Sequence, residues 1–425
     1  MRFQGLLADP SEVQKTQTMA SISSLRSLTL DLPPSCVEFW PLNPQYAVVG
    51  TYNLEKPTTN GDGEFNEPET EKVGKQKPQE RNGSIVLVKV VDDEVKIVQN
   101  LSTPFAILDI HFVPGEHPQS LFGVASSTGS IGLFQLVEAR GNRLNNDTDN
   151  FTIPIMTHIQ TIEVADPTVL VTAFQWHPER GGSNGRNLIA CLSLSNGSIT
   201  IGEIQPELTT SKVTFEHVGS HDLEAWTVSL AHNGTGIYSG GDDSCMMFSD
   251  FTEHIDTLWP KASNLDRTPK VPWKDQKTHN AGVTAILPLH ATSSETLIVT
   301  GSYDDSIRLF SAPAIGRRKV LTEMNLGGGV WRLKHLNSQN NPSFPSQGDH
   351  PNVLILASCM HAGPRIVRLK HGTDGKDWSF EVLAKFEEHK SMNYGSDCQP
   401  YLNDEGQRTF ITTSFYDRLL CLWRY

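Results

Sequence analysis

The chain has 425 residues, of which 37% are apolar and 8% aromatic, and its net charge is −13. This composition supplies enough apolar side chains for a buried core and excludes a wholly disordered protein. The acidic balance repels phosphate backbones, so we expect no nucleic-acid partner. No apolar run reaches the about 18 residues of a membrane span, and the first 24 residues lack the apolar stretch of a secretory signal. We therefore expect a globular protein that does not associate with membranes.

The six cysteines are isolated from one another. They form no CxxC pair and no zinc-type cluster with histidines. This usage is typical of reduced thiols, so the sequence predicts a cytoplasmic protein with no metal and no cofactor.

Polar segments interrupt an otherwise strand-like pattern of short apolar runs and turns. Residues 1–24 contain few apolar side chains and predict a flexible N-terminal extension, and the run Leu25–Leu32 that follows predicts a strand. Glu55–Arg81 is rich in Pro, Gly, Lys and Glu, which predicts a disordered insertion. A second insertion at 252–278 contains tryptophans that can pack on a core, so we expect it to be partly ordered.

A repeat organises the rest of the chain. The stretch Gly301–Ser311 (GSYDDSIRLFS) has the strand–turn–strand ending of a WD repeat, with Phe310 and Ser311 in place of the Trp-Asp pair. The pattern recurs in seven units, 46 to 68 residues apart, at Val88, Phe134, Gly202, Phe248, Phe310, Leu369 and Trp423. The shorter spacings are close to the about 40–45 residues of a WD repeat. The sequence thus predicts one all-β domain over 25–425, a seven-bladed WD-repeat β-propeller whose ring is closed by the N-terminal strand.

Searches for catalytic motifs return one string of interest. Gly181–Gly185 reads GxSxG and places Ser183 where a nucleophile elbow has its serine. An elbow needs a strand before it and a helix after it, whereas here a His-Pro turn precedes and a strand-like run follows. We therefore interpret Ser183 as a loop residue, and the sequence identifies no nucleophile.

Unusual residues gather in the turns and links that open on one face of a propeller. Blades two and three carry ordinary turns of small polar residues and glycine there, such as the one at Ser195. Blades four to seven carry aromatic and charged residues, and blade one adds Tyr52. The turns supply Asp242, Tyr303, Asp304, His361, Tyr416 and Asp417, and the links supply Trp226, Trp331 and Tyr394. This mapping predicts a working site on one rim of the ring.

These residues also have structural interpretations. Asp242, Asp304 and Asp417 occupy the position where WD repeats place an aspartate that holds the blade's histidine. A structural role is favoured for the three histidines that open repeats, His221, His279 and His389. The aromatic residues could fill the central channel. His361 stands in a turn where no hydrogen bond of the blade requires a histidine, so a functional role is favoured for this residue.

In order along the chain, these motifs resemble the WD-repeat diphthine methylesterase family of the diphthamide pathway, also called diphthine methyltransferases. The resemblance covers 36–54 and 221–425, and blades two and three add little. It rests on His221–Trp226, Tyr238–Asp243, Thr300–Asp304, Gly328–Arg332, Cys359–Gly363, Tyr394–Asp397 and Ser414–Asp417.

The resemblance implies hydrolysis of the methyl ester of methylated diphthine on elongation factor 2, which leaves diphthine for amidation. Elongation factor 2 would be the partner, and other proteins of the pathway stay open as partners. A quaternary ammonium is held by aromatic faces and diffuse negative charge. The expected substrate-binding residues are therefore Trp226, Asp242, Tyr303, Trp331, Tyr394 and Tyr416. The competing interpretation is a non-catalytic adaptor or a reader of methylated or basic peptides.

For the hydrolysis itself, the rim predicts an activated water. Ester cleavage needs a base to deprotonate water and donors to hold the oxyanion. We expect His361 to be the base, with Asp304 or Asp417 orienting it or countering the trimethylammonium, and backbone N–H groups of Gly327–Gly329 to form the oxyanion hole. An aspartate as the base, with His361 shaping the pocket, is the alternative.

Overall fold

Strands form here because short apolar runs are separated by turn residues. Several of these runs, such as β4 (Tyr46–Thr51), β9 (Leu121–Ser126) and β13 (Leu188–Leu194), are buried at every residue because each sheet is covered on both faces. The computed structural model describes residues 19–55, 80–115, 120–140, 152–181, 185–206, 213, 215–259, 265, 267–292, 295–313, 316–336, 352–372 and 377–425. Within these residues, no helix is long and apolar enough to cross a membrane.

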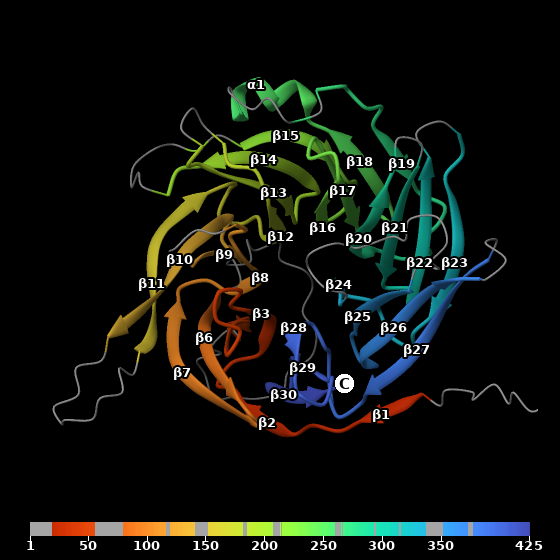
Figure 1. Ribbon diagram of the computed structural model, residues 1–425. Coiled ribbons are helices and arrows are strands. Elements are labelled where there is room, and N and C mark those ends of the chain that lie inside the picture. Colours follow the sequence, from red (N-terminus) through yellow and green to blue (C-terminus); the bar gives the residue numbers. More distant parts are fainter. Residues whose placement is uncertain are drawn as a thin grey trace, which may run out of the picture.

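Seven sheets stand as blades around a central axis (Figure 1), with the first strand of each blade nearest the axis. Blade one contains β3 (Pro34–Phe39), β4, β6 (Arg81–Val91) and β7 (Glu94–Thr103), and β5 (Asn53–Leu54) pairs with β6. Blades two and three are β8 (Ile107–Phe112), β9, β10 (Ser130–Arg140) and β11 (Thr152–Glu163), then β12 (Val171–Trp176), β13, β14 (Ser198–Ile204) and β15 (Phe215–Ser220).

The remaining blades follow the same order. Blades four and five are β16 (Ala225–Leu230), β17 (Gly236–Gly241), β18 (Met246–Asp250) and β19 (Trp273–Asp275), then β20 (Val283–Ala291), β21 (Glu295–Ser302), β22 (Ser306–Pro313) and β23 (Lys319–Asn325). Blades six and seven are β24 (Arg332–His335), β25 (Asn352–Cys359), β26 (Gly363–His371) and β27 (Trp378–Phe386), then β28 (Ser396–Leu402), β29 (Arg408–Ser414) and β30 (Leu419–Arg424). The predicted seven-bladed, all-β propeller is confirmed.

The N-terminal part of the chain closes the ring at two places. β2 (Arg26–Thr29) pairs antiparallel with β30, which confirms the predicted closing strand. β1 (Ala20–Ile22) pairs parallel with β27 of blade six, so the expectation of a flexible extension as far as residue 24 is wrong for these residues. Their apolar side chains pack against a cluster that includes Phe386 and Trp423. A strand of three residues is too short to show a period in the sequence.

The two insertions differ. Residues 56–79 of the first lie outside the described residues. In the second, η1 (Thr252–His254) and α1 (Ile255–Leu258) precede Trp259, which is buried. The same insertion also contains β19, the outer strand of blade four, where Trp273 stacks on Phe248 with ring centroids 6.2 Å apart. The segment is therefore partly a component of the blade.

Candidate functional site

One residue of most inner strands is displaced by an irregularity in strand pairing. In blades one to five, pairing of the first and second strands skips a residue of the first strand. Such a β-bulge bends the strand and re-aims a side chain. The skipped residues are Ser35, Leu108, Thr172, Trp226 and Thr284. All except Thr284 line one cavity, together with Trp331 and Tyr394, which lie just before the inner strands of blades six and seven.

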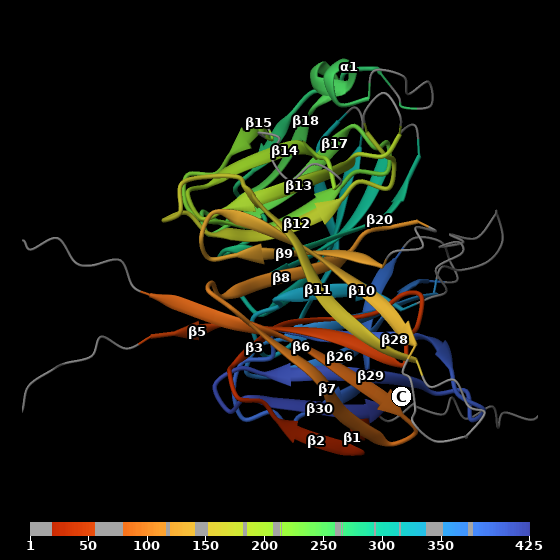
Figure 2. The same ribbon diagram turned by 90° about the vertical axis from the view of Figure 1, so that its left-hand side faces the viewer.

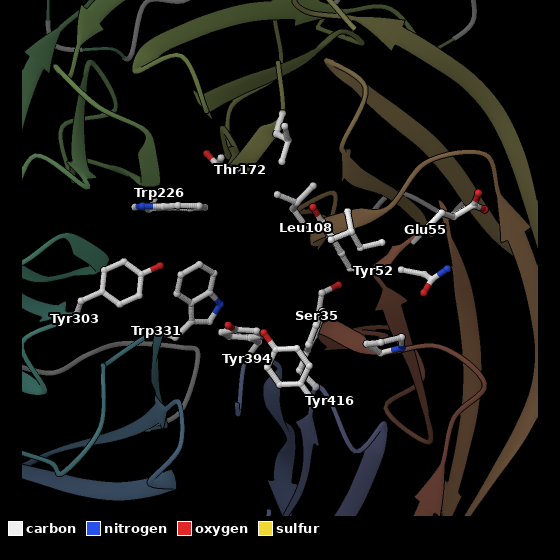
Figure 3. A pocket seen from close by; sticks show the side chains of 15 residues that line it. Ser35, Tyr52, Glu55, Leu108, Thr172, Trp226, Tyr303, Trp331, Tyr394 and Tyr416 are labelled. Carbon is white, nitrogen blue, oxygen red and sulfur yellow. The ribbon is translucent and has the colours of Figure 1, made fainter. Parts of the chain in front are cut away.

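This cavity has a volume of about 590 Å³ and lies at one end of the central channel (Figure 3). Its wall along blades four to seven is aromatic and consists of Trp226, Tyr303, Trp331, Tyr394, Phe415 and Tyr416. The opposite side is formed in part by Leu108 and Thr172, and Leu170 also lines the cavity. Blade one adds Tyr52 and Glu55, and Figure 2 shows β5 and the start of β6 projecting from this end of the ring. We call the six aromatic residues the aromatic wall.

Trp331 occupies the centre of the aromatic wall. Its ring centroid lies 5.7 Å from that of Trp226 and 6.0 Å from that of Tyr303. On the other side, it lies 5.0 Å from Tyr394, whose ring is 5.3 Å from Phe415. These separations are in the range of favourable aromatic pairs. The wall is therefore a connected set of rings whose positions depend on one another.

Asp242 supports the aromatic wall without lining the cavity. Its Oδ1 accepts a hydrogen bond from Nε1 of Trp226 at 3.3 Å. Burial raises the pKa of Tyr303, and the charges of Tyr394 and Asp242 add to this effect. The carboxylate therefore places negative charge behind two rings of the wall, where it increases the attraction for a cation in the cavity.

The aspartate that holds the histidine of blade four is Asp243, so the sequence alignment that assigned this position to Asp242 is wrong by one residue. Oδ1 of Asp243 lies 3.0 Å from Nδ1 of His221. Oδ2 accepts the backbone N–H of the next residue, Asp222, at 3.0 Å. Consecutive aspartates made the register of this turn ambiguous, and only the hydrogen bonds resolve it.

Asp304 and Asp417 are engaged in the corresponding turns of blades five and seven. Asp304 pairs with Arg308 at 2.8 Å, and Asp417 accepts hydrogen bonds from the hydroxyl groups of Ser391 and Ser414. Burial opposes their ionisation, but these hydrogen bonds hold the pKa of both carboxyl groups below the ordinary value. Neither residue lines the cavity.

His361 is exposed on the turn between β25 and β26 and does not line the cavity. This turn lies against the glycine link before β24, since a Cβ at Gly328 would stand 2.5 Å from the carbonyl oxygen of Cys359. The N–H of Gly327 donates to Oδ1 of Asn325 at 2.9 Å, so this group is not free to hold an oxyanion. The structure thus places His361 beside the link that carries Trp331.

A layer of charged side chains lies next to the aromatic wall. It lines a second cavity of about 280 Å³ and consists of Glu38, Asp109, His111, Arg332, Lys334 and Asp397. Nδ1 of His111 lies 2.8 Å from Glu38, and its Nε2 lies 3.2 Å from Asp109. Burial opposes the charge of His111, but Asp109 and Glu38 raise its pKa to about 10. His111 is therefore an imidazolium at neutral pH and cannot serve as a base.

The carboxylates of this charged layer also bond neighbouring blades. The N–H groups of Phe39, Phe112 and Phe174 donate to Asp397, Glu38 and Asp109 of the preceding blade, at 2.7, 3.3 and 3.3 Å. Lys334 forms an ion pair with Asp397. The negative charges are thus compensated within the layer, as buried charges must be.

The hydroxyl and thiol groups near the aromatic wall are not activated nucleophiles. Ser35 donates its hydroxyl proton to a carbonyl oxygen of the next blade at 2.6 Å, and Thr172 does the same. Burial raises the pKa of the Cys36 thiol to about 12. Ser183 of the GxSxG string lies outside the described residues. None of Ser35, Thr172 and Cys36 therefore has the features of an activated nucleophile.

Among the described residues, donor atoms suited to a metal ion come together at His221, Asp243 and Cys245. Both ring nitrogens of His221 already face partners, Asp243 and the hydroxyl of Ser239 at 2.9 Å. Burial raises the pKa of Cys245 to about 12, so it is a thiol. This cluster is a structural feature of blade four.

Sequence reasoning missed the charged layer and Glu55. A signal for the layer existed, because Glu38, Asp109 and His111 are the charged or ionisable polar residues of two inner strands that are otherwise mostly apolar. Glu55 was assigned to the first insertion, whereas it lines the cavity at the end of β5.

Comparisons with known proteins find relatives along nearly the whole chain. No family model matches the chain. The chain is 28% identical over 92% of its length to a diphthine methyltransferase of Schizosaccharomyces pombe, of which it covers 95%. It is 26% identical over 94% of its length to a diphthine methyltransferase of Saccharomyces cerevisiae, of which it covers 97%. The predicted resemblance to diphthine methyltransferases is confirmed.

A solved structure shows the fold alone. One chain of a mitotic checkpoint complex superposes with a TM-score of 0.57 at 14% identity, covering 100% of this chain and 99% of that one.

Proposed function

We propose that this protein is a methylesterase that hydrolyses the methyl ester of methylated diphthine on elongation factor 2. The observation that carries the proposal is the aromatic wall around a cavity of about 590 Å³, in a chain similar along nearly its whole length to diphthine methyltransferases. Water would add to the ester carbonyl carbon, the bond to the methoxy oxygen would break, and methanol would leave with a proton. The carboxylate of diphthine would remain on the protein substrate.

The aromatic wall suits the trimethylammonium group of this substrate. A quaternary ammonium has no N–H to donate, so attraction comes from ring faces and nearby negative charge. The wall supplies Trp226, Tyr303, Trp331, Tyr394 and Tyr416, with Asp242 behind Trp226. The volume also lies in the range of sites for ligands of this size. Tyr416 is 70% exposed, which leaves the mouth accessible to a side chain presented by a large protein.

The base that activates water has two candidates. An imidazole is a common general base, but His361 lies beside the cavity, so its action requires the substrate to extend over the 359–363 turn. Glu55 is the carboxylate that lines the cavity among the described residues. Asp304 and Asp417 would position the turns that carry Tyr303 and Tyr416 and would not act as the base, because their oxygens are engaged by Arg308 and by the serines of their turns. Substitution of His361 and Glu55 separates the two candidates.

Methanol release from elongation factor 2 carrying methylated diphthine tests the function. We expect stoichiometric methanol and a loss of one methyl group in the mass of the modified peptide. Elongation factor 2 whose diphthine lacks the ester methyl group is the control and should bind without releasing methanol. Tight binding of the methylated substrate without methanol release would instead support a peptide reader and overturn the proposal.

A further inference from the structure

The charged layer and the aromatic wall form two adjoining halves of one site. Tyr394 lines both the aromatic cavity and the charged cavity. The boundary runs between consecutive residues, because Trp331 lines the first cavity and Arg332 the second. A ligand held by the aromatic wall therefore lies close to a guanidinium group.

Arg332 is the cation of the charged layer that has more N–H donors than its described partners use. Its Cζ lies 4.8 Å from the ring centroid of Trp331, and its Nη1 donates to the Trp331 carbonyl oxygen at 3.2 Å. The nearest carboxylate oxygen among the described residues, Oδ1 of Asp109, is 3.9 Å from Nη2, which is too long for a hydrogen bond. A guanidinium has five N–H donors. Arg332 lines the charged cavity, and 26% of its side chain is exposed, so a ligand there can reach it.

Asp109 has partners besides Arg332. Its Oδ2 lies 3.2 Å from Nε2 of His111 and 3.3 Å from the N–H of Phe174. The other cation nearby, Lys334, is paired with Asp397. An anion that binds Arg332 would compete with Oδ1 of Asp109, but His111 and the N–H of Phe174 would still hold Oδ2, so this buried carboxylate would not be left without a partner.

We propose that Arg332 binds the carboxyl group, as ester or carboxylate, of a ligand whose quaternary ammonium lies against the aromatic wall, so that the site recognises betaine-type ligands and their esters. The inference rests on the proposed function and extends it. Arg332 would donate to the carbonyl oxygen of the ester, stabilise the oxyanion that forms there, and hold the carboxylate product. A cation without a carboxyl group would instead be repelled by Arg332, which stacks on the same tryptophan.

Arg332 should attract a carboxylate and repel a cation. Two small probes, glycine betaine and tetramethylammonium, therefore test the proposal. Binding of each to the full chain is measured by titration calorimetry for the wild type, Arg332→Gln and Arg332→Lys. We expect Arg332→Gln to weaken glycine betaine about tenfold and to leave tetramethylammonium unchanged or tighter. Arg332→Lys keeps the charge and should retain part of the preference. The control is Arg424→Gln, since Arg424 at the end of β30 bonds Asp93 and the carbonyl of Asp92 in blade one and lines neither cavity.

Each alternative outcome is decisive. If Arg332→Gln weakens both probes equally, the substitution has damaged the cavity and selectivity for the carboxyl group is refuted. If the wild type binds glycine betaine no better than tetramethylammonium, Arg332 does not recognise the carboxyl group, whatever the methanol assay gives. Absence of methanol release with the betaine preference intact would overturn the esterase function and leave Arg332 as part of a reader site.

Discussion

Replacing Trp331 with alanine removes the ring that connects the two halves of the aromatic wall. Trp226 and Tyr303 on one side and Tyr394 on the other all contact this ring. No other ring contacts all three of these residues in the described structure, so a neighbour cannot replace it. We expect the variant to fold but to bind tetramethylammonium more weakly.

The magnitude follows from the contacts. A cation over an aromatic ring contributes about 0.5–2 kcal/mol, so the dissociation constant should rise by a factor of about 2 to 30. Three aromatic pairs are also lost, at about 0.5–1.5 kcal/mol each. The lost pairs alone should lower the free energy of unfolding by about 1.5–4.5 kcal/mol, which is less than the about 5–15 kcal/mol of a typical folded protein.

Calorimetric titration with tetramethylammonium and thermal unfolding of the same samples separate binding from stability. Trp331→Phe keeps a ring and should retain most of the affinity. The matched control is Trp378→Ala in the outer strand of the same blade, where the ring contacts His371 at 4.4 Å. Unchanged affinity in Trp331→Ala, or an equal loss in Trp378→Ala, would refute binding by the aromatic wall.

Three further predictions concern stability and turnover. Burial lowers the pKa of His279 and of His389 from 6.5 to about 4, so the stability that each neutral ring contributes is complete above pH 6.5 and lost as the pH falls towards 4. At most about 3 kcal/mol each is at stake; urea unfolding at pH 7 and 4.5 measures it, and His279→Gln should show a smaller difference. Deleting residues 1–33 removes β1 and β2 and should lower the melting temperature sharply, and an unchanged value would contradict closure of the ring by these strands. If His361 is the base, His361→Ala should slow methanol release about 10²–10⁴-fold with substrate binding retained, whereas full turnover of that variant, and loss in Glu55→Gln, would assign the role to Glu55.

The fold could be predicted from the sequence because each blade carries its own copy of the strand–turn–strand repeat. A segment such as Gly301–Ser311 defines two strands and the turn between them, and seven copies define a ring. Strands without a copy of the repeat were missed. Ala20–Ile22 is too short for a period to be visible, and Trp273–Asp275 stands inside a polar insertion. Both are held by packing against distant residues, which no local pattern encodes.

The aromatic side of the cavity was predictable for a geometric reason. Turns and links at equivalent repeat positions open on one face, so Tyr303 and Trp331 could be placed together from the alignment alone, and the structure has both in one cavity. The carboxylates could not be placed in this way. A shift of one residue exchanges Asp242 with Asp243, and the partners of Asp304 are backbone and guanidinium groups that the sequence does not identify.

Closure of the ring by β2 and β30 has a consequence for synthesis of the protein on the ribosome. The two strands stand near opposite ends of the chain, so this contact spans almost the whole sequence. Such non-local pairing is slow and forms only after β30 has emerged. Until then, the earlier blades can assemble one by one, while blade seven is incomplete and the strand edges at the open joint are exposed to other chains. Nascent chains that stall before Leu419 should therefore be clients of chaperones that cover unpaired strands.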